Sequence, residues 1–549
     1  MMLRRVLILA TTLILIALSV FVITAQDDTL VTLTILHTND THSHHEGDSD
    51  GGGAARMATV INQVRAEEDN VILLDGGDRF TGTLFHTVYL GQDNVRIMNL
   101  MEYDAMALGN HEFDNGDEVL ADFVNGVNFP VLAANIDFSA SPILSDIGIE
   151  QYTIVDVNGV QVGVIGLTTP DTPEIANPGV DLVFSDDLVT IANTLAAELT
   201  EQGVNIIVLL THTGINTDFV IAPQLENIDV FVGGHSHSLL SNQNAPAVAE
   251  YPVVFTNETT EDIVLYVQAQ EHYNYLGRLD LQFTVDGVAD DWDGDTIFLS
   301  PYITPDPIME FVVAELAEPI AAIRAEPAGA TSEVVLVGDR RICRVEECNL
   351  GNLIADAQRA HTGTDVAIMN AGGIRRDLPA TDLTLGDVLE VQPFGNLVST
   401  MDVTGAVLLQ AIENGISGIT VGEGGIVSRD GASGRFPQVS GMRFSYDPNL
   451  EVGNRVTSIE IQQEDGSFAP LDPEATYSLT VPNFVAGGGD GYTMLTAEGS
   501  NVYLFGSVDW EVTRDYMQEI SPIGADDGIQ VDAEAPRIQL ENAELAPIE

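Results

Sequence analysis

Apolar residues in the first half of the chain follow two alternating patterns. Residues 71–78 (VILLDGGD), 204–210 (VNIIVLL) and 228–234 (IDVFVGG) contain short continuous apolar runs, which are typical of buried strands. Residues 54–70 (AARMATVINQVRAEEDN) and 187–203 (DLVTIANTLAAELTEQG) instead carry apolar side chains at helical spacing. Strands that alternate with helices are typical of a layered α/β domain. The pattern therefore predicts an α/β domain over residues 29–300.

The pattern changes near residue 301. A single helical pattern lies between Pro305 and Pro327, which predicts a linker helix within residues 301–328. A second α/β region with glycine-rich turns follows, and we expect it to be a smaller domain over residues 329–541. Residues 542–549 carry no strong pattern, so we expect a disordered tail.

The N-terminal residues 1–25 differ from the rest of the chain. Arg4 and Arg5 precede an apolar run over residues 6–23, and the small residues Thr24 and Ala25 follow it. This order predicts an export signal peptide and a periplasmic, cell-surface or extracellular protein. The run is long for a signal, so an uncleaved membrane anchor is the alternative, and we expect membrane association only in that case.

The charge balance is strongly acidic. The chain has 83 acidic and 20 basic residues, a net charge of −63, and every basic residue is arginine. Such a surface repels nucleic acid polymers and anionic membranes, and it favours a monomer or a weak dimer. Salt would screen the self-repulsion, so the composition indicates either a saline habitat or a lysine-poor genome with acidic exported proteins.

The only two cysteines, Cys343 and Cys348, lie close together in the segment ICRVEEC. In an exported chain this spacing favours a disulfide that closes a small loop. The alternative, a thiol metal or redox site, lacks the Cys-x-x-Cys spacing.

Five apolar strands in the first half each run into a short loop of metal-ligand residue types. In chain order these residues are Asp40 and His42 (LTILHTNDTH), Asp78 (VILLDGGD), Asn110, His111 and Asp114 (AMALGNHEFD), His212 (IIVLLTHTG), and His235 and His237 (VFVGGHSH). Ligands of open α/β sheets bind at the carboxyl ends of strands, so the five loops can converge. One histidine after a strand is usually a surface or core residue, whereas five such loops in order predict a metal site.

The residue types of these loops suit a pair of divalent ions. Asp78 lies in a Gly-Gly-Asp turn, where the backbone can approach closely, and is the natural bridging carboxylate. Two ions held in this way can bind a phosphoryl oxygen, activate water and stabilise in-line displacement at phosphorus. His44 and His45 continue into a flexible loop, and we assign them to the edge of the site.

The second half offers arginines and aromatic residues in glycine-containing loops. Arg340, Arg341, Arg344, Arg375 and Arg376 are candidates for bidentate phosphate contacts, and ion pairing is the alternative, which we favour for Arg341 and Arg376. Phe394 (VQPFGNLV) and Phe484 (VPNFVAGGGDGYTML) could clamp a flat base by stacking, although a lone Phe is usually a core residue.

The motifs ILHTNDTH, LDGGD, GNHEFD, THTG and GGHSH, in this order, resemble the calcineurin-like metallophosphoesterase domain of the secreted 5′-nucleotidase family. That family includes the bacterial periplasmic UDP-sugar hydrolase/5′-nucleotidase and animal ecto-5′-nucleotidase. The resemblance covers nearly the whole mature chain. It implies a four-layer α/β/β/α sandwich followed by a smaller C-terminal α/β substrate-binding domain.

The resemblance also implies roles for single residues. Asp40, His42, Asp78 and His237 would hold one ion, and Asp78, Asn110, His212 and His235 the other; some members have Gln at the position of His237. His111, oriented by Asp114, would stabilise the transition state and the leaving oxygen, and a carboxylate three residues away can keep such an imidazole protonated. The family pattern places phosphate contacts at Arg340, Arg344 and Arg375, a ribose or phosphate contact at Asn370, the base between Phe394 and Phe484, a base-edge contact at Asn396 and a ribose contact at Asp490.

We therefore expect an exported 5′-nucleotidase with two divalent ions, such as Zn²⁺, Mn²⁺ or Co²⁺. Its substrates would be nucleoside 5′-monophosphates and could extend to di- and triphosphates, UDP-sugars or NAD. A 2′,3′-cyclic-nucleotide phosphodiesterase/3′-nucleotidase and a non-catalytic surface binding protein are the alternatives. Because the metal ligands and the substrate residues lie on different domains, we also expect a domain rotation during turnover.

Overall fold

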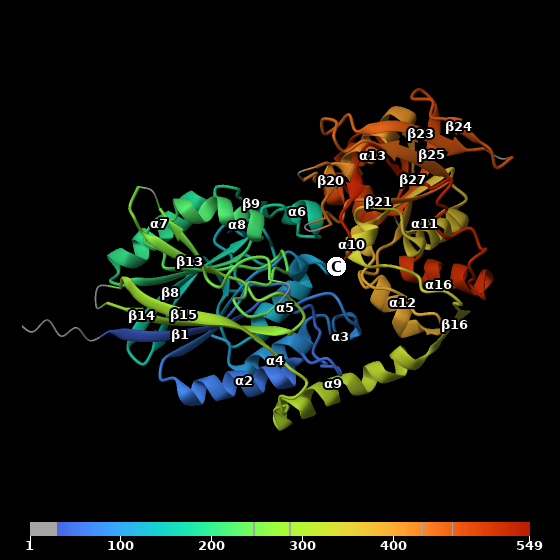
Figure 1. Ribbon diagram of the computed structural model, residues 1–549. Coiled ribbons are helices and arrows are strands. Elements are labelled where there is room, and N and C mark those ends of the chain that lie inside the picture. Colours follow the sequence, from blue (N-terminus) through green and yellow to red (C-terminus); the bar gives the residue numbers. More distant parts are fainter. Residues whose placement is uncertain are drawn as a thin grey trace, which may run out of the picture.

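The structure is a computed structural model of the chain, and it describes residues 30–548 apart from 245–246, 258, 285–286, 423, 430–431, 464 and 505 (Figure 1). The expected export signal at residues 1–25 lies outside the described residues. Within the described part, no helix combines the length and the apolar character needed to cross a membrane.

The N-terminal region contains two large sheets. The first has the strand order β15-β14-β1-β2-β3-β4-β6, in which β1, β2, β3, β4 and β6 run parallel and β14 pairs antiparallel with both β1 and β15 at one edge. Its strands are β1 (Val31–Thr38), β2 (Val71–Asp75), β3 (Ala105–Ala107), β4 (Val131–Leu132), β6 (Ile149–Glu150), β14 (Tyr275–Phe283) and β15 (Ala289–Phe298). The second has the order β12-β13-β11-β10-β8-β7, with β7 (Tyr152–Val157), β8 (Val160–Thr168), β10 (Ile206–His212), β11 (Val230–Val232), β12 (Val253–Thr256) and β13 (Ile263–Val267).

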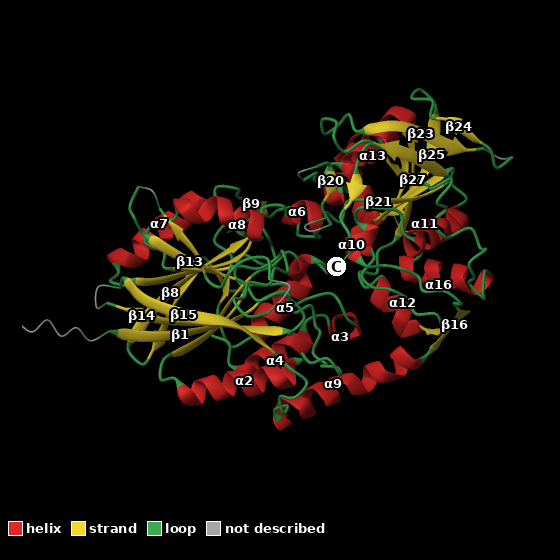
Figure 2. Cartoon of the chain, in the orientation of Figure 1, coloured by secondary structure: helices red, strands yellow, loops and turns green. Residues whose placement is uncertain are grey.

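Side chains on successive positions of the first sheet face different layers. Leu33 and Ile35 of β1 belong to the core shared with the second sheet and α7, whereas Leu36 belongs to the core under α2, α4 and α5. The helices of this region are α2 (Ala54–Glu67), α3 (Leu84–Tyr89), α4 (Gln92–Met101), α5 (Asp117–Gly126), α6 (Thr172–Ile175), α7 (Leu188–Glu201) and α8 (Ile215–Ile221). Helices therefore cover the outer faces of two packed sheets, and the expected α/β/β/α sandwich is confirmed (Figure 2).

The predicted linker helix is α9 (Pro307–Ala325), and it runs beneath both regions in Figure 1. Asp306 caps it by accepting hydrogen bonds from the N–H groups of Ile308 and Met309. One face of α9, including Val312 and Leu316, packs into the core under α2 and α4, and its C-terminal part contacts α12 of the second region. The connection is therefore a packed helix and not a free tether.

The C-terminal region contains a five-stranded and a four-stranded sheet. The first has the order β21-β17-β25-β19-β26: β21 (Pro437–Ser440), β17 (Val366–Asn370), β25 (Thr476–Pro482), β19 (Val398–Thr404) and β26 (Ser500–Tyr503). The second has the order β24-β23-β22-β27: β24 (Phe468–Pro470), β23 (Val456–Gln462), β22 (Met442–Tyr446) and β27 (Ile538–Leu540). The helices are α10 (Arg340–Cys343), α11 (Asn349–Thr362), α12 (Leu385–Val391), α13 (Gly405–Ile416), α14 (Asn483–Ala486), α15 (Thr493–Glu498) and α16 (Asp509–Glu519).

Two local expectations for this region have different outcomes. The disulfide between Cys343 and Cys348 is present, with 5.3 Å between the two Cα atoms, and closes the loop from α10 to α11. The expectation of a disordered tail is wrong for the described residues 542–548. There β28 (Glu544–Leu545) pairs in parallel with β20 (Ile426–Val427), because the backbone groups of this short segment find partners and Leu545 packs against the core of the region.

Candidate functional site

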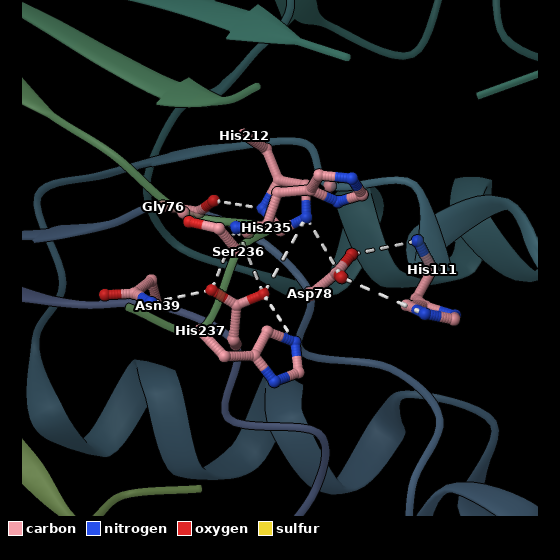
Figure 3. Close-up of polar contacts among 12 residues, drawn as sticks. Asn39, Gly76, Asp78, His111, His212, His235, Ser236 and His237 are labelled. Carbon is pink, nitrogen blue, oxygen red and sulfur yellow. Dashed lines mark hydrogen bonds and ion pairs between the residues drawn. The ribbon is translucent and has the colours of Figure 1, made fainter. Parts of the chain in front are cut away.

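The five ligand-bearing loops converge at one place. β1, β2 and β3 are neighbours in the first sheet, and β10 and β11 are neighbours in the second, so their carboxyl ends meet at the same edge of the sandwich (Figure 3). Ligand atoms lie within 4.8 Å of one another in three overlapping groups: Asp40, His42 and His237; His42, Asp78 and His111; and Asp78, His212 and His235. Asp78 and His42 each occur in two groups.

Distances within the cluster place Asp78 between its two halves. Asp78 Oδ2 lies 3.0 Å from His212 Nε2 and 3.9 Å from His42 Nε2. Asp40 Oδ1 lies 3.3 Å from His237 Nε2 and 3.9 Å from His212 Nε2. The carboxylates of Asp78 and Asp40 therefore each lie close to histidines from both halves of the cluster.

The donor set fits divalent cations. The Oδ1 atom of Asn110 is buried and has no hydrogen-bond partner among the described residues, so it is free to bind a cation. Burial lowers the pKa of His212, but the carboxylates of Asp78 and Asp40 outweigh this effect and raise the pKa to about 10. The cluster thus concentrates negative charge around imidazoles, which is an environment that attracts a metal ion.

In three of the histidines, the Nδ1 atom, which faces away from the centre of the cluster, contacts a hydrogen-bond acceptor. His42 Nδ1 lies 3.0 Å from the carbonyl oxygen of Phe80, His212 Nδ1 lies 2.6 Å from that of Gly76, and His237 Nδ1 contacts Glu271. Partners of this kind fix the orientation and tautomer of metal-binding histidines. They leave the three Nε2 atoms directed at the centre of the cluster.

The backbone of the ligand loops has an unusual conformation. Asp40, His42, Asp78, His235 and His237 have φ angles of 51°, 49°, 58°, 73° and 54°, in the left-handed region that residues other than glycine rarely adopt. Such conformations cost free energy and cluster at functional sites. Gly109 permits the loops to meet, because a Cβ atom there would lie 2.2 Å from Asp78 Oδ1.

Glu112 is a site residue that the sequence did not reveal. Its buried carboxylate accepts hydrogen bonds from the backbone N–H groups of Asp78 (3.0 Å), Arg79 (2.7 Å), Phe80 (3.2 Å) and Gly109 (2.7 Å). It therefore ties the loop after β2 to the loop after β3. Burial, and next the charge of Asp78, raise the pKa of Glu112 to about 7. The signal in the sequence is a carboxylate beside two ligands, which does not distinguish this role from metal binding.

His111 faces the cluster and carries a carboxylate behind it. Its Nδ1 atom lies 2.6 Å from Asp114 Oδ2, and its Nε2 atom lies 4.0 Å from Asp78 Oδ2. Burial alone would lower the pKa of His111, but the charges of Asp114 and Asp78 raise this pKa above the ordinary value. An imidazole held in this way can keep a proton at Nε2 close to a reacting group.

His44 and His45 are not part of the cluster. His45 Nε2 lies 2.7 Å from Asp93 Oδ2 in a buried pair, and His44 stacks on His272 with 3.7 Å between the ring centroids. His44 lines the cavity next to the cluster.

One cavity of about 2200 Å³ lies between the two regions and opens onto the cluster. All the substrate-binding candidates line it: Arg340, Arg344, Asn370, Arg375, Phe394, Asn396, Phe484 and Asp490. Arg435 also lines the cavity, and no motif in its part of the sequence predicts this position. The structure thus brings the candidates of the second region to the cluster of the first.

Arg344 and Arg375 are partly buried in this cavity. Among the described residues neither forms an ion pair with a carboxylate, although the chain has 83 acidic residues. Burial, and then the charges of Arg375 and Arg340, lower the pKa of Arg344 to about 9. Burial and Arg340 also lower the pKa of Arg375. Two guanidinium groups held in this way in one cavity are arranged for an anionic ligand.

The other arginines of this group have partners. Arg341 pairs with Asp339 at 2.6 Å, and Arg376 pairs with Glu390, as the sequence favoured. Arg340 reaches across to the first region, where Nη1 lies 2.9 Å from His237 Nδ1 and Nη2 lies 3.3 Å from Glu271 Oε1.

Aromatic and polar residues complete the cavity. The ring of Phe394 lies nearly parallel to that of His111, with 5.9 Å between centroids, and Arg375 Cζ lies 5.6 Å from the Phe394 centroid. Asn370 donates a hydrogen bond of 2.6 Å to Asp490 Oδ2. The carbonyl of Asn396 accepts a hydrogen bond of 2.8 Å from the N–H of Asp509 at the start of α16, which fixes the loop after Phe394.

Comparisons with known proteins give consistent matches. Residues 33–239 match the family described as calcineurin-like phosphoesterase, and residues 327–497 match the 5′-nucleotidase C-terminal domain. A snake venom 5′-nucleotidase of Naja atra is 36% identical over 525 residues, which cover 89% of this chain and 96% of the relative.

Two further matches extend the comparison. A trifunctional nucleotide phosphoesterase protein of Bacillus subtilis is 36% identical over 529 residues, which are 90% of this chain but 34% of that protein. The solved structure of a 5′-nucleotidase precursor from Thermus thermophilus has a TM-score of 0.84 and 39% identity, and it covers 93% of this chain and 100% of its own.

Proposed function

The chain belongs to the 5′-nucleotidase family, with a calcineurin-like phosphoesterase domain and a 5′-nucleotidase C-terminal domain, and we propose that it releases phosphate from nucleoside 5′-monophosphates with two divalent ions. Membership makes it a metal-dependent phosphohydrolase. One observation carries the choice of substrate class. The cavity sets a cluster of carboxylates and imidazoles against two Phe rings and two arginines that pair with no carboxylate among the described residues. A ligand that fits this lining combines an anionic phosphate with a flat base.

Seven residues would hold the ions: Asp40, His42, Asp78, Asn110, His212, His235 and His237, with Asp78 shared. Ions bound there supply Lewis-acid stabilisation of the phosphoryl oxygens and a nucleophile from water at neutral pH. The mixed nitrogen and oxygen donors suit Zn²⁺, Mn²⁺ or Co²⁺.

The chain's own side chains would orient the substrate and move a proton. Arg344 and Arg375 bind the phosphate oxygens, while Phe394 and Phe484 stack on the base. His111 donates the proton held at Nε2 to the leaving 5′-oxygen, and Asp114 keeps the ring in position. Every one of these residues is intact, which favours an enzyme over a non-catalytic binding protein.

Export is part of the proposal. The leader-like residues 1–25 and the disulfide between Cys343 and Cys348 support it, and one relative is a venom protein. Mass spectrometry of the protein isolated from its native host would detect a mature N-terminus near residue 26. An intact residue 1 in that sample would contradict cleavage.

The catalytic proposal is tested by metal removal. We expect the full chain to release phosphate from AMP, to lose this activity on dialysis against a chelator, and to regain it with Mn²⁺ or Zn²⁺. Full activity in metal-depleted protein, or no activity with any of these ions, would contradict the proposal.

A further inference from the structure

Glu271 lies where the two regions meet, and no motif in the sequence points to it. Its carboxylate contacts His237 Nδ1 within the first region. The same carboxylate lies 3.3 Å (Oε1 to Nη2) and 3.5 Å (Oε2 to Nη1) from Arg340, which begins α10 in the second region. One side chain therefore contacts both a candidate metal ligand and a cation from the other region.

The loop that carries Glu271 is fixed next to Asp40. Asn39 Nδ2 donates a hydrogen bond of 2.5 Å to the carbonyl of Gln270, and the N–H of His272 donates one of 3.0 Å to the carbonyl of Asp40. Gln270 and His272 adopt positive φ angles of 62° and 60°. This conformation turns the intervening carboxylate towards His237 and is maintained only by such surrounding contacts.

The side chains of Glu271 and Arg340 differ in how much of their surface is exposed. The Glu271 side chain is 14% exposed, whereas that of Arg340 is 45% exposed. Movement of the second region would remove Arg340 and expose Glu271, but it would leave the contact between Glu271 and His237 intact, because both lie in the first region. The ion pair can therefore form and break as the regions approach and separate.

We propose that Glu271 is a positioning residue that orients the metal ligand His237 and also receives Arg340 when the second region docks. Docking then places Arg340 beside Glu271 and His237 at the metal centre. The proposal rests on the proposed function in one respect, since it takes His237 as a metal ligand. It assigns Arg340 to docking and leaves phosphate binding to Arg344 and Arg375, which have no carboxylate partner among the described residues.

The test uses the full chain without nucleotide. We compare wild type, Glu271→Gln, Arg340→Met and the double variant by small-angle X-ray scattering and by Mn²⁺ titration of metal-free protein. Glu271→Gln is expected to weaken Mn²⁺ binding about 10- to 100-fold, as loss of a partner behind a metal-bound histidine does. Arg340→Met is expected to change it less than about threefold, because Arg340, although it lies 2.9 Å from His237 Nδ1, is 45% exposed, and Glu271 still holds His237 without it.

Both single variants are expected to increase the radius of gyration, and the double variant should increase it no further, because the two changes remove one interaction. Arg341→Met is the matched control, since Arg341 is the neighbouring arginine on α10 and pairs with Asp339 in its own region. It should match wild type in both measurements.

The proposal is overturned if Glu271→Gln leaves either Mn²⁺ affinity or the scattering unchanged. It is also overturned if Arg340→Met leaves the scattering unchanged, since Arg340 would then not hold the second region in place. If Glu271→Gln does not fold, Glu271→Asp and Arg340→Met provide the same comparison. Neither readout requires hydrolysis, so a protein that fails to cleave nucleotides can still support or overturn this inference.

Discussion

Replacement of Arg344 by methionine should change the stability of the ligand-free protein and its activity in opposite directions, if Arg344 binds phosphate as proposed. Arg344 is partly buried without a carboxylate partner among the described residues, and burial lowers its pKa from the ordinary arginine value to about 9. At about 1.36 kcal/mol for each pKa unit, and with allowance for the water in the cavity, the charged form costs about 2–4 kcal/mol. Methionine keeps most of the apolar stem and removes that cost, so the ligand-free variant should be more stable by a similar amount.

The pH dependence follows from the direction of the shift. Because the pKa is lowered in the folded protein, Arg344 is charged in both states below about pH 9, and its destabilising effect is complete there. Above that pH the folded protein loses the proton first, so the advantage of Arg344→Met should shrink. Function should change in the opposite direction. Loss of a buried charged contact to phosphate costs about 2–5 kcal/mol, which lowers kcat/KM at least about 30-fold.

Urea unfolding measures the change in stability without screening the charges, the same experiment with inorganic phosphate measures phosphate binding, and phosphate release from AMP measures kcat/KM. Phosphate should stabilise wild type by binding the folded state, by about 2.7 kcal/mol at 100 times its Kd, and should stabilise Arg344→Met far less. The matched control is Arg443→Met, because Arg443 pairs with Glu460 at 2.6 Å on the surface. Its loss should change stability by less than about 1 kcal/mol. The reasoning is refuted if Arg344→Met is less stable than wild type or keeps full kcat/KM.

Three further predictions concern other parts of the molecule. Burial raises the pKa of Asp509 to about 7, so the folded protein holds a proton that the unfolded chain releases near pH 4. The free energy of unfolding therefore falls as pH rises from about 4 to about 7, and Asp509→Asn should remove up to about 4 kcal/mol of that fall. Urea midpoints with an unchanged pH dependence in this variant would count against the prediction. Phe394→Ala and Phe484→Ala should each remove about 1–3 kcal/mol of stacking with the base and so raise KM for AMP. Normal KM values in both variants would argue against a base clamp. His111→Asn should lower kcat about 10²- to 10⁴-fold with little change in Mn²⁺ affinity, and an equal loss of metal binding would indicate a ligand instead of a proton donor.

The sequence predicted those parts of the site that follow from local pattern. β2, β10 and β11 begin with continuous apolar runs, and β1 alternates apolar residues with threonine before Ile35 and Leu36. A ligand that follows such a strand is placed by the sheet itself. Asp40, Asp78 and His235 could therefore be assigned together before their distances were known. The linker helix was predictable for the same reason, because its apolar spacing and flanking prolines are local.

Other features depend on contacts that no local pattern contains. Glu112 accepts N–H groups from a segment more than thirty residues away, and Glu271 meets Arg340 across the boundary between the regions. The pairing of Glu544–Leu545 with β20 joins segments separated by more than one hundred residues. That Arg344 pairs with no carboxylate of the described chain is likewise a property of the folded surroundings, since acidic residues are abundant in the sequence.

The central claim is that the cavity positions a nucleoside 5′-phosphate against a metal cluster. It is tested most directly by phosphate release from a panel of 5′-, 3′- and 2′,3′-cyclic nucleotides and UDP-sugars, with the full chain supplied with Mn²⁺ and His111→Asn as the control. We expect release from 5′-monophosphates and a loss of at least about 100-fold in the control. Activity confined to 3′- or cyclic nucleotides, or equal activity in the control, would contradict the account.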